Sequence, residues 1–220
     1  MTKIDIVSGF LGAGKTTLIK KLLDEVFRGE KIVLIENEFG QIGIDGGFLK
    51  DAGVEITEMN SGCICCSLVG DFGAALKQVL ADYAPDRIVI EPSGVGKLSD
   101  VIAAVERVQA EAPDLHLNSF VTVVDATKAK IYMKNFGEFF NNQVEHASAI
   151  LLSRTQKMDE AKLNTAVKLL RDKNAKAAIL TTPWDQLTGA QILSAMEGGH
   201  SLAQELMEEI AHQHHHHDHD

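Results

Sequence analysis

Short apolar runs alternate with amphipathic segments along most of this 220-residue chain. Largely apolar runs typical of buried strands occupy residues 4–7, 31–35, 87–90, 120–124, 149–152 and 177–180. Apolar positions three and four residues apart, typical of helices, occur in residues 17–27, 71–83, 98–108 and 159–173. Continuous apolar strands separated by helices predict a parallel sheet that is covered on both faces.

The remaining elements are shorter and complete the predicted domain organisation. Residues 54–57 alternate between apolar and polar positions like a half-exposed strand, and a short helix is expected near Gln191. Residues 201–211 are amphipathic. We therefore predict a doubly wound α/β domain with a mainly parallel sheet over residues 1–198, and a helix with a His-rich tail over residues 199–220.

The composition narrows the classes of partner. With 45% hydrophobic and 24% charged residues, the chain is typical of one globular domain with a sizeable core. The formal net charge is -10 and no basic stripe is visible, so we expect no nucleic-acid partner. We also expect a cytoplasmic protein that does not enter a membrane, because no signal peptide and no membrane-length apolar run are present.

A complete Walker A motif, Gly-Phe-Leu-Gly-Ala-Gly-Lys-Thr, lies between the first predicted strand and helix, at Gly9 to Thr16. Its glycines let successive backbone N–H groups turn toward phosphate oxygens, and the helix adds the positive end of its dipole. Lys15 is expected to neutralise the terminal phosphates, and the hydroxyl of Thr16 to bind Mg²⁺. The expected phosphate-binding residues are Gly12, Ala13, Gly14, Lys15, Thr16 and Thr17. This motif predicts a P-loop NTPase domain.

Three acidic residues are candidates for the same site. Glu91 ends a buried strand, and ligands of such sheets bind at the carboxyl ends of the strands. A carboxylate there can hold Mg²⁺ or polarise an attacking water, although capping of a helix is the alternative role. Asp45 and Asp125 also follow or face the site in the order of the chain.

A Cys-x-Cys-Cys sequence supplies the second chemical signal, at Cys63, Cys65 and Cys66. In a loop, three thiols within four residues can bind one thiophilic cation, and zinc leaves a fourth position for another ligand. Copper(I) also favours thiolates, and burial as small apolar residues is the alternative role. We expect a transition-metal loop here.

The chain ends in a His-rich segment that is either a native weak metal store or an engineered tag. Interruptions at Gln213 and Asp218 favour the native store, because a tag is usually an unbroken run. The candidate weak ligands are His212, His214, His215, His216, His217 and His219.

Together these motifs make the sequence similar to the CobW-type family of P-loop GTPases, metallochaperones related to the nickel-insertion GTPases HypB and UreG. The motifs follow the order of the family within residues 4 to 182. They are Gly9 to Thr17, Glu36-Asn37-Glu38-Phe39-Gly40, Gly43-Ile44-Asp45-Gly46, Asn60 to Cys66 and Glu91-Pro92-Ser93-Gly94.

The resemblance implies nucleotide-gated delivery of a metal. Asp45 would match the switch aspartate near Mg²⁺, and Glu91 the second acid at the nucleotide, so that Lys15, Glu91 and Asp45 form the catalytic set. The three cysteines would match the metal-binding cysteines of the family, which lie between the two switch regions.

The base-reading segment departs from the family pattern, which is Asn-Lys-x-Asp after an apolar strand. Here Ser153-Arg154-Thr155-Gln156 follows the strand. An aspartate only accepts hydrogen bonds and suits guanine, whereas Gln156 both donates and accepts and suits adenine at least as well. Ser153, Arg154 and Gln156 are thus candidate base contacts, and both GTP and ATP stay open.

Two hypotheses about function follow. In the first, a metallochaperone slowly hydrolyses GTP or ATP with Mg²⁺, binds Zn²⁺ or another transition metal, and serves a client metalloprotein. A homodimer is one of the assemblies that this hypothesis allows. In the second, the nucleotide is a regulatory ligand, and the protein is a non-catalytic regulator or activator of a partner metalloenzyme.

Overall fold

The computed structural model describes residues 1–37, 53–58, 63–69, 72–92 and 97–198. Within these residues, eight strands form a single sheet in the order β3-β4-β2-β5-β1-β6-β7-β8. Neighbouring strands are parallel except β3, which runs antiparallel to β4 at the edge. The strands are β1 (Thr2–Gly9), β2 (Ile32–Asn37), β3 (Gly53–Glu58), β4 (Cys63–Val69), β5 (Arg87–Pro92), β6 (Leu115–Asp125), β7 (Ala149–Ser153) and β8 (Ala178–Leu180). The prediction of a mainly parallel sheet is confirmed.

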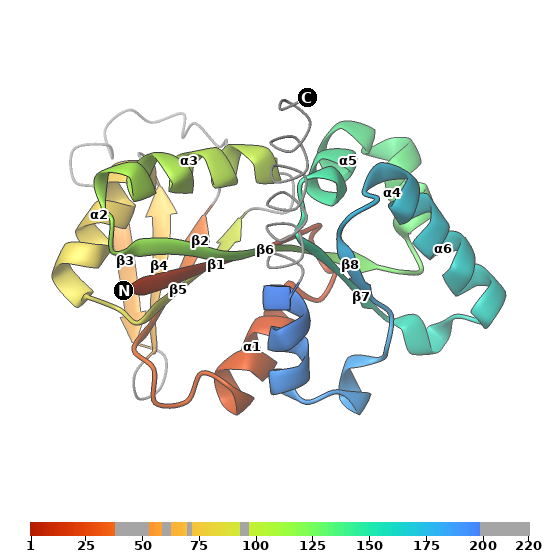
Figure 1. Cartoon of the computed structure of the whole chain (residues 1–220), viewed down its shortest axis with the longest axis horizontal. Coiled ribbons are helices and arrows are strands. Elements are labelled where there is room, and N and C mark those ends of the chain that lie inside the picture. Colours follow the sequence, from red (N-terminus) through yellow and green to blue (C-terminus); the bar gives the residue numbers. More distant parts are fainter. Residues whose placement is uncertain (38–52, 59–62, 70–71, 93–96, 199–220) are drawn as a thin grey trace, which may run out of the picture.

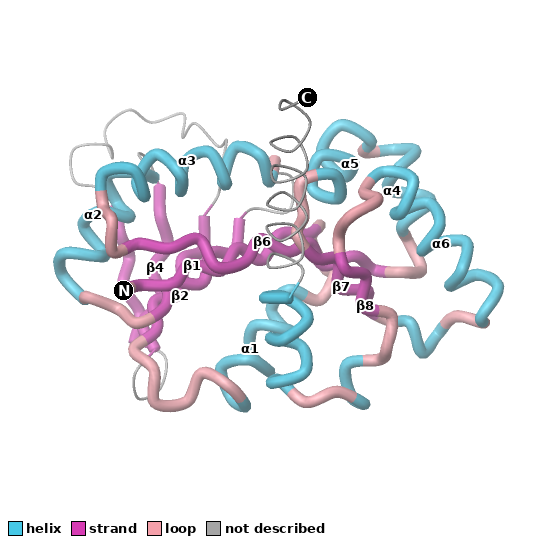
Figure 2. The backbone as a smooth tube through the Cα atoms, viewed as in Figure 1, coloured by secondary structure: helices cyan, strands magenta, loops and turns pink. Residues whose placement is uncertain are grey.

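Helices cover both faces of the sheet, as Figure 1 and the backbone tube in Figure 2 show. Helix α1 and the helical residues 189–198 lie together on one face, and the other helices cover the opposite face. The helices are α1 (Lys15–Glu25), α2 (Phe72–Tyr83), α3 (Leu98–Glu111), α4 (Ala129–Asn135), α5 (Gly137–Glu145) and α6 (Glu160–Lys173), with short 3-10 turns η1 (Thr155–Lys157) and η2 (Trp184–Gln186). The predicted helix at residues 201–211 and the His-rich tail lie outside the described residues.

Each face of the sheet has its own hydrophobic core. Leu18 and Leu22 of α1 pack with Ile192 and Met196 against one face. On the other face, α2, α3 and α5 bury a larger cluster, which includes Phe140. Both sides of the parallel strands are therefore removed from water, which explains why the strands read as continuous apolar runs.

Helices α4 and α5 were absent from the sequence-based expectations, because residues 129–145 lack a regular apolar period. Their conformation depends on a contact that is distant in sequence. The ring of Phe10, in the loop after β1, lies 4.9 Å from Tyr132, 5.5 Å from Phe136 and 5.7 Å from Phe140, measured between ring centroids. Such aromatic pairs stabilise by burial and ring geometry, so this packing overrides the weak local pattern.

The strand order places the candidate site. The order reverses around β1, since β5 and β2 lie on one side of it and β6, β7 and β8 on the other. Ligands of open α/β sheets bind in the crevice outside the carboxyl ends of the strands at such a reversal. The Walker A residues begin at the carboxyl end of β1 and therefore lie at this crevice.

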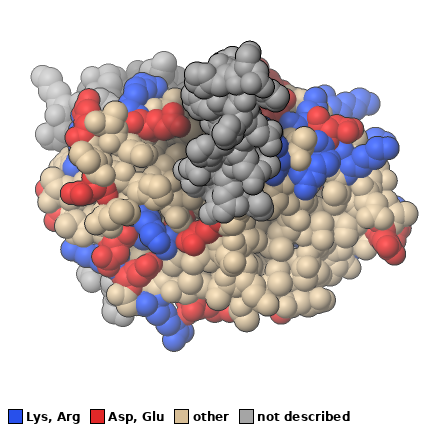
Figure 3. Space-filling model, viewed as in Figure 1, with Lys and Arg blue, Asp and Glu red and all other residues tan. Residues whose placement is uncertain are grey.

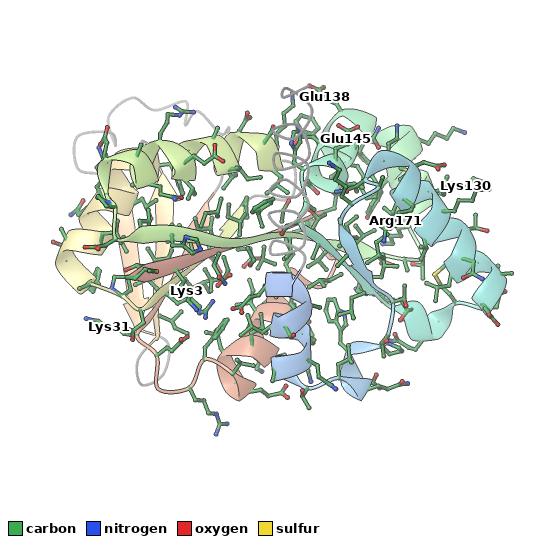
Figure 4. The ribbon with its side chains drawn as sticks, viewed as in Figure 1. Lys3, Lys31, Lys130, Glu138, Glu145 and Arg171 are labelled. Carbon is green, nitrogen blue, oxygen red and sulfur yellow. The ribbon has the colours of Figure 1, made fainter. Side chains whose placement is uncertain are left out.

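Charged side chains are unevenly distributed over the surface (Figure 3), and basic ones gather toward the α4–α6 side. Lys130, Glu138, Glu145 and Arg171 lie on that side, while Lys3 lies near the start of β1 (Figure 4). In the described part of the chain, no helix is long and apolar enough to cross a membrane.

Candidate nucleotide site

Glycines shape the loop between β1 and α1 through backbone conformations that other residues rarely adopt. Gly9 has φ +148°, and a Cβ added to it would lie 2.5 Å from the carbonyl oxygen of Val123. Gly14 has φ +113°, and a Cβ there would lie 3.2 Å from the indole ring of Trp184. The loop therefore requires glycine both for its turn and for close contact with its neighbours.

Lys15 is the first residue of α1 and is only 6% exposed. Its Nζ donates a hydrogen bond to the carbonyl oxygen of Pro92, at 3.2 Å. Burial lowers the pKa of Lys15, while the negative charge of Glu91 acts in the opposite direction. A lysine that follows a glycine-rich loop would be expected to be exposed, but Lys15 is buried and bonded to the last residue of β5.

Glu91 and Thr16 come together beside Lys15. The hydroxyl of Thr16 lies beside the carboxylate of Glu91, and hydrogen bonding from it acts to lower the pKa of Glu91. Burial raises the pKa of Glu91, Lys15 lowers it, and Glu36 on the neighbouring strand raises it further. Glu36 and Glu91 are register partners at the carboxyl ends of β2 and β5. The structure thus collects a lysine, a hydroxyl and two carboxylates at the start of α1.

On the other side of the loop, the segment after β7 is tied to β6 and to the loop itself. The guanidinium of Arg154 donates to the buried carboxylate of Asp125 at 2.7 Å, and Thr127 donates to the same carboxylate. The hydroxyl of Ser153 donates to the carbonyl oxygen of Ala13. Asp125 therefore positions Arg154 rather than standing free in the site.

Gln156 and Trp184 lie on the two short turns at this end of the sheet. Gln156 is exposed within η1, after an Arg154 whose backbone is left-handed at φ 58°. Trp184 begins η2 and packs against the core under α1. Trp184 and Gly14 are far apart in the sequence, and the fold brings the indole ring to the loop.

Several predicted ligands lie outside the described residues. They include Asp45 and all candidate histidines of the tail, and no side chain is described for Cys63, Cys65 or Cys66. Among the side chains that the structure does describe, no three or more His, Cys, Asp or Glu residues form a metal-binding group. The predicted Mg²⁺ and transition-metal ligand sets thus stay predictions.

Comparison with known proteins identifies the family. The model for the CobW/HypB/UreG nucleotide-binding domain matches residues 3–181. The chain belongs to the CobW/HypB/UreG family.

The individual relatives carry the names zinc chaperone and zinc-regulated GTPase metalloprotein activator. The zinc chaperone YjiA of Escherichia coli is 34% identical over 184 residues, which cover 81% of this chain and 56% of that protein. The zinc-regulated GTPase metalloprotein activator 1 of Schizosaccharomyces pombe is 26% identical and aligns with 84% of this chain and 46% of its own length. This CobW/HypB/UreG chain spans about half the length of the curated relatives that it matches.

Solved structures agree with the assignment. The Zn(II)-bound YjiA GTPase of E. coli superimposes with a TM-score of 0.67 at 31% identity, covering 82% of this chain and 57% of that chain. HypB of Archaeoglobus fulgidus, at 14% identity and a TM-score of 0.52, shares the fold, with 88% and 86% of the two chains covered.

The cysteines lie in a different local structure from the one expected for this CobW/HypB/UreG chain. Residues 63–69 form strand β4 rather than a loop, with Cys66 paired to Ile35 of β2 and to Ile56 of β3. The physical reason is that β2 would otherwise leave a row of backbone N–H and C=O groups unpaired. The expectation of a cysteine loop is therefore wrong, and metal binding by these residues stays a prediction.

Proposed function

We propose that this protein is a nucleotide-dependent metallochaperone that hydrolyses NTP and couples the nucleotide state to binding of a thiophilic metal, with zinc as the first candidate. The P-loop geometry and the family membership support nucleotide binding. The names of its relatives, zinc chaperones and a zinc-regulated activator, support the metal.

One observation carries the proposal. The phosphate-binding lysine and the candidate Mg²⁺ ligand are both held by the end of β5, through the contacts of Lys15 with Pro92 and of Thr16 with Glu91. A bound triphosphate would compete for Lys15, because phosphate oxygens accept stronger, charge-assisted hydrogen bonds than a carbonyl does. Nucleotide binding would therefore change the contacts of β5 immediately before residues 93–96.

The residues beside the loop fit Mg²⁺, which prefers oxygen ligands. Thr16 would supply a hydroxyl ligand, and Glu91, with Asp45, a carboxylate ligand. When bound, the ion would neutralise charge that develops on the phosphates during transfer to water. Lys15 would neutralise the terminal phosphate and hold it in place, so that catalysis rests on positioning and electrostatics.

The sheet offers a route between the nucleotide and the cysteines. Strand β4, with Cys63, Cys65 and Cys66, pairs with β2, and β2 pairs with β5. Cys66 is the register partner of Ile35, the residue before Glu36, and Glu36 is the register partner of Glu91. Two strand pairings thus separate the metal candidates from the phosphate site, which supports coupling between them.

In the rival hypothesis, the protein binds the nucleotide but does not hydrolyse it. A regulator or activator of a partner metalloenzyme would bind nucleotide and metal without hydrolysis. Gln156 is exposed and stands where the family pattern has an aspartate, so both GTP and ATP stay candidates for the nucleotide. Client proteins and a homodimer belong to the proposal in both cases, as does a cytoplasmic location.

Hydrolysis by matched lysine variants tests the proposal. We would measure binding and multiple turnover of Mg·GTP and Mg·ATP by the wild type, Lys15→Met and Lys20→Met, with and without zinc. Lys20 is an exposed lysine of the same helix and serves as the control. We expect Lys15→Met alone to lose binding and turnover. Binding without turnover would favour the regulator, and an unchanged Lys15→Met would contradict the P-loop assignment.

A further inference from the structure

The segments that follow β1, β7 and β8 meet at Gly14 of the phosphate loop. Strands β6, β7 and β8 lie side by side, so the segments after β7 and β8 leave the sheet at the same edge as the loop after β1. A Cβ at Gly14 would lie 3.2 Å from two ring carbons of Trp184 and 3.5 Å from the Cβ of Ser153. Trp184 therefore lies beside the segment that the family pattern assigns to the base.

Two buried polar groups, one on each of the short turns η1 and η2, have no hydrogen-bond partner in the part of the chain that the structure describes. Within the described residues, the indole N–H of Trp184 and the hydroxyl of Thr155 make no hydrogen bond, although both atoms are shielded from water. Leaving such groups unpaired costs free energy, so native proteins rarely keep them without a reason. The two unpaired groups therefore mark η1 and η2 as turns where the fold accepts a cost that a functional role would explain.

The positive charge of Arg154, next to Ser153, is already held in place by an ion pair. An Nη atom of Arg154 lies 2.7 Å from a carboxylate oxygen of Asp125, and Asp125 is only 3% exposed. The guanidinium is therefore held in one orientation by a buried carboxylate. With Gln156 exposed on the adjacent turn, no described carboxylate is left in this segment to read the edge of guanine. Recognition through the face of the base is the chemistry that these residues offer.

We infer that Trp184 is a base-contacting residue, against whose indole ring the purine of the bound nucleotide packs. This inference rests on the nucleotide binding proposed above and names the part of the site that holds the base. Stacking on an aromatic ring tolerates either purine, because every base has a π-face. It therefore predicts similar affinities for GTP and ATP.

Trp184 also provides its own readout, because it is the only tryptophan of the chain. Intrinsic fluorescence thus reports on this position without a label. Mg·GTP and Mg·ATP should both change the emission of the wild type. Mg·tripolyphosphate, which carries the phosphates without a base, should bind and change the emission much less.

Two substitutions of Trp184 distinguish the loss of base stacking from a loss of folding. Trp184→Leu removes the aromatic face, and we expect affinity for both nucleotides to fall by roughly 5- to 150-fold, the range that loss of one base stack gives. Trp184→Phe keeps a ring and should stay within about threefold of the wild type. Affinity for Mg·tripolyphosphate, measured by calorimetry, should be unchanged in both. Tyr83→Leu, at the end of α2 near the start of β5, is the control for losing an aromatic residue.

Two results would overturn the inference while leaving nucleotide binding intact. One is a Trp184→Leu variant that binds both nucleotides as the wild type does. The other is a Trp184→Phe variant that loses as much affinity as Trp184→Leu. A wild type that binds neither nucleotide would instead contradict the proposed function itself.

Discussion

Removal of the charge of Asp5 should destabilise the fold strongly, although Asp5 lies away from the loop. Asp5 is 1% exposed within β1 and accepts hydrogen bonds from Arg87, from Asn118 at 2.9 Å and from Ser119 at 2.6 Å. Burial alone would lower the pKa of Arg87, but the charges and hydrogen bonds of Asp5 and Glu30 outweigh it and raise that pKa. The ion pair joins β1 to β5, and the hydrogen bonds from Asn118 and Ser119 join β1 to β6.

The magnitude follows from what Asp5→Asn leaves behind. Loss of one partner of a buried ion pair costs about 3–5 kcal/mol. Arg87 keeps Glu30 at 3.1 Å and packs its guanidinium 4.3 Å from the ring of Phe27. These contacts favour the lower end of the range, about 3 kcal/mol. At about 2–4 °C per kcal/mol for a chain of this size, the melting temperature should fall by about 6–12 °C.

Glu30→Gln is the matched control, because it removes a more exposed carboxylate that pairs with the same arginine. The Glu30 side chain is 38% exposed, and exposed ion pairs are worth about 0–1 kcal/mol. Urea denaturation and thermal unfolding of both variants would measure the difference. Equal costs for the two variants, or a cost below about 1 kcal/mol for Asp5→Asn, would refute the reasoning from burial.

Three further predictions concern the ligands. Because burial raises the pKa of Glu91, its carboxylate takes up a proton at a higher pH than an ordinary glutamate does. Mg²⁺-dependent nucleotide affinity, measured against pH, should therefore begin to fall at a higher pH on acidification. Glu91→Gln should weaken nucleotide binding at neutral pH and remove this loss of affinity at acidic pH. Gln156→Asp should raise affinity for GTP relative to ATP by about tenfold or more, since a carboxylate accepts both donors of guanine. Competition of GTP and ATP for the site measures this ratio of affinities, and an unchanged ratio would contradict the role given to Gln156. Deletion of residues after Ala211 should lower the number of zinc ions bound but preserve the tightest site, and loss of that site would reassign it to the tail.

The sequence predicts those parts of the structure that depend on local rules. The loop from Gly9 to Thr16 is predictable because its glycines, its lysine and its flanking strand and helix are contiguous. The alternation of strands and helices likewise follows from local periodicity. The apposition of Glu91 with Lys15 and Thr16 needs only the rule that parallel strands end at one edge.

What the sequence could not predict depends on long-range contacts. The cysteine segment is a strand because β2 needs a partner on its outer side, a fact about the sheet rather than about residues 63–69. Helices α4 and α5 depend on Phe10, more than a hundred residues earlier. Trp184 reaches the phosphate loop only because β8 completes the sheet beside β7.

The coupling between metal and nucleotide tests the central claim most directly. The measurement is a zinc titration of the wild type and of the Cys63→Ser, Cys65→Ser, Cys66→Ser triple variant, each without nucleotide, with diphosphate, and with a non-hydrolysable triphosphate. Our account predicts that the wild type binds zinc with different affinity in the three states, by about 5- to 150-fold, and that zinc changes nucleotide affinity by the same factor. The triple variant should lose this difference but still bind nucleotide. Equal zinc affinities of the wild type in all three states would contradict a nucleotide-gated metallochaperone.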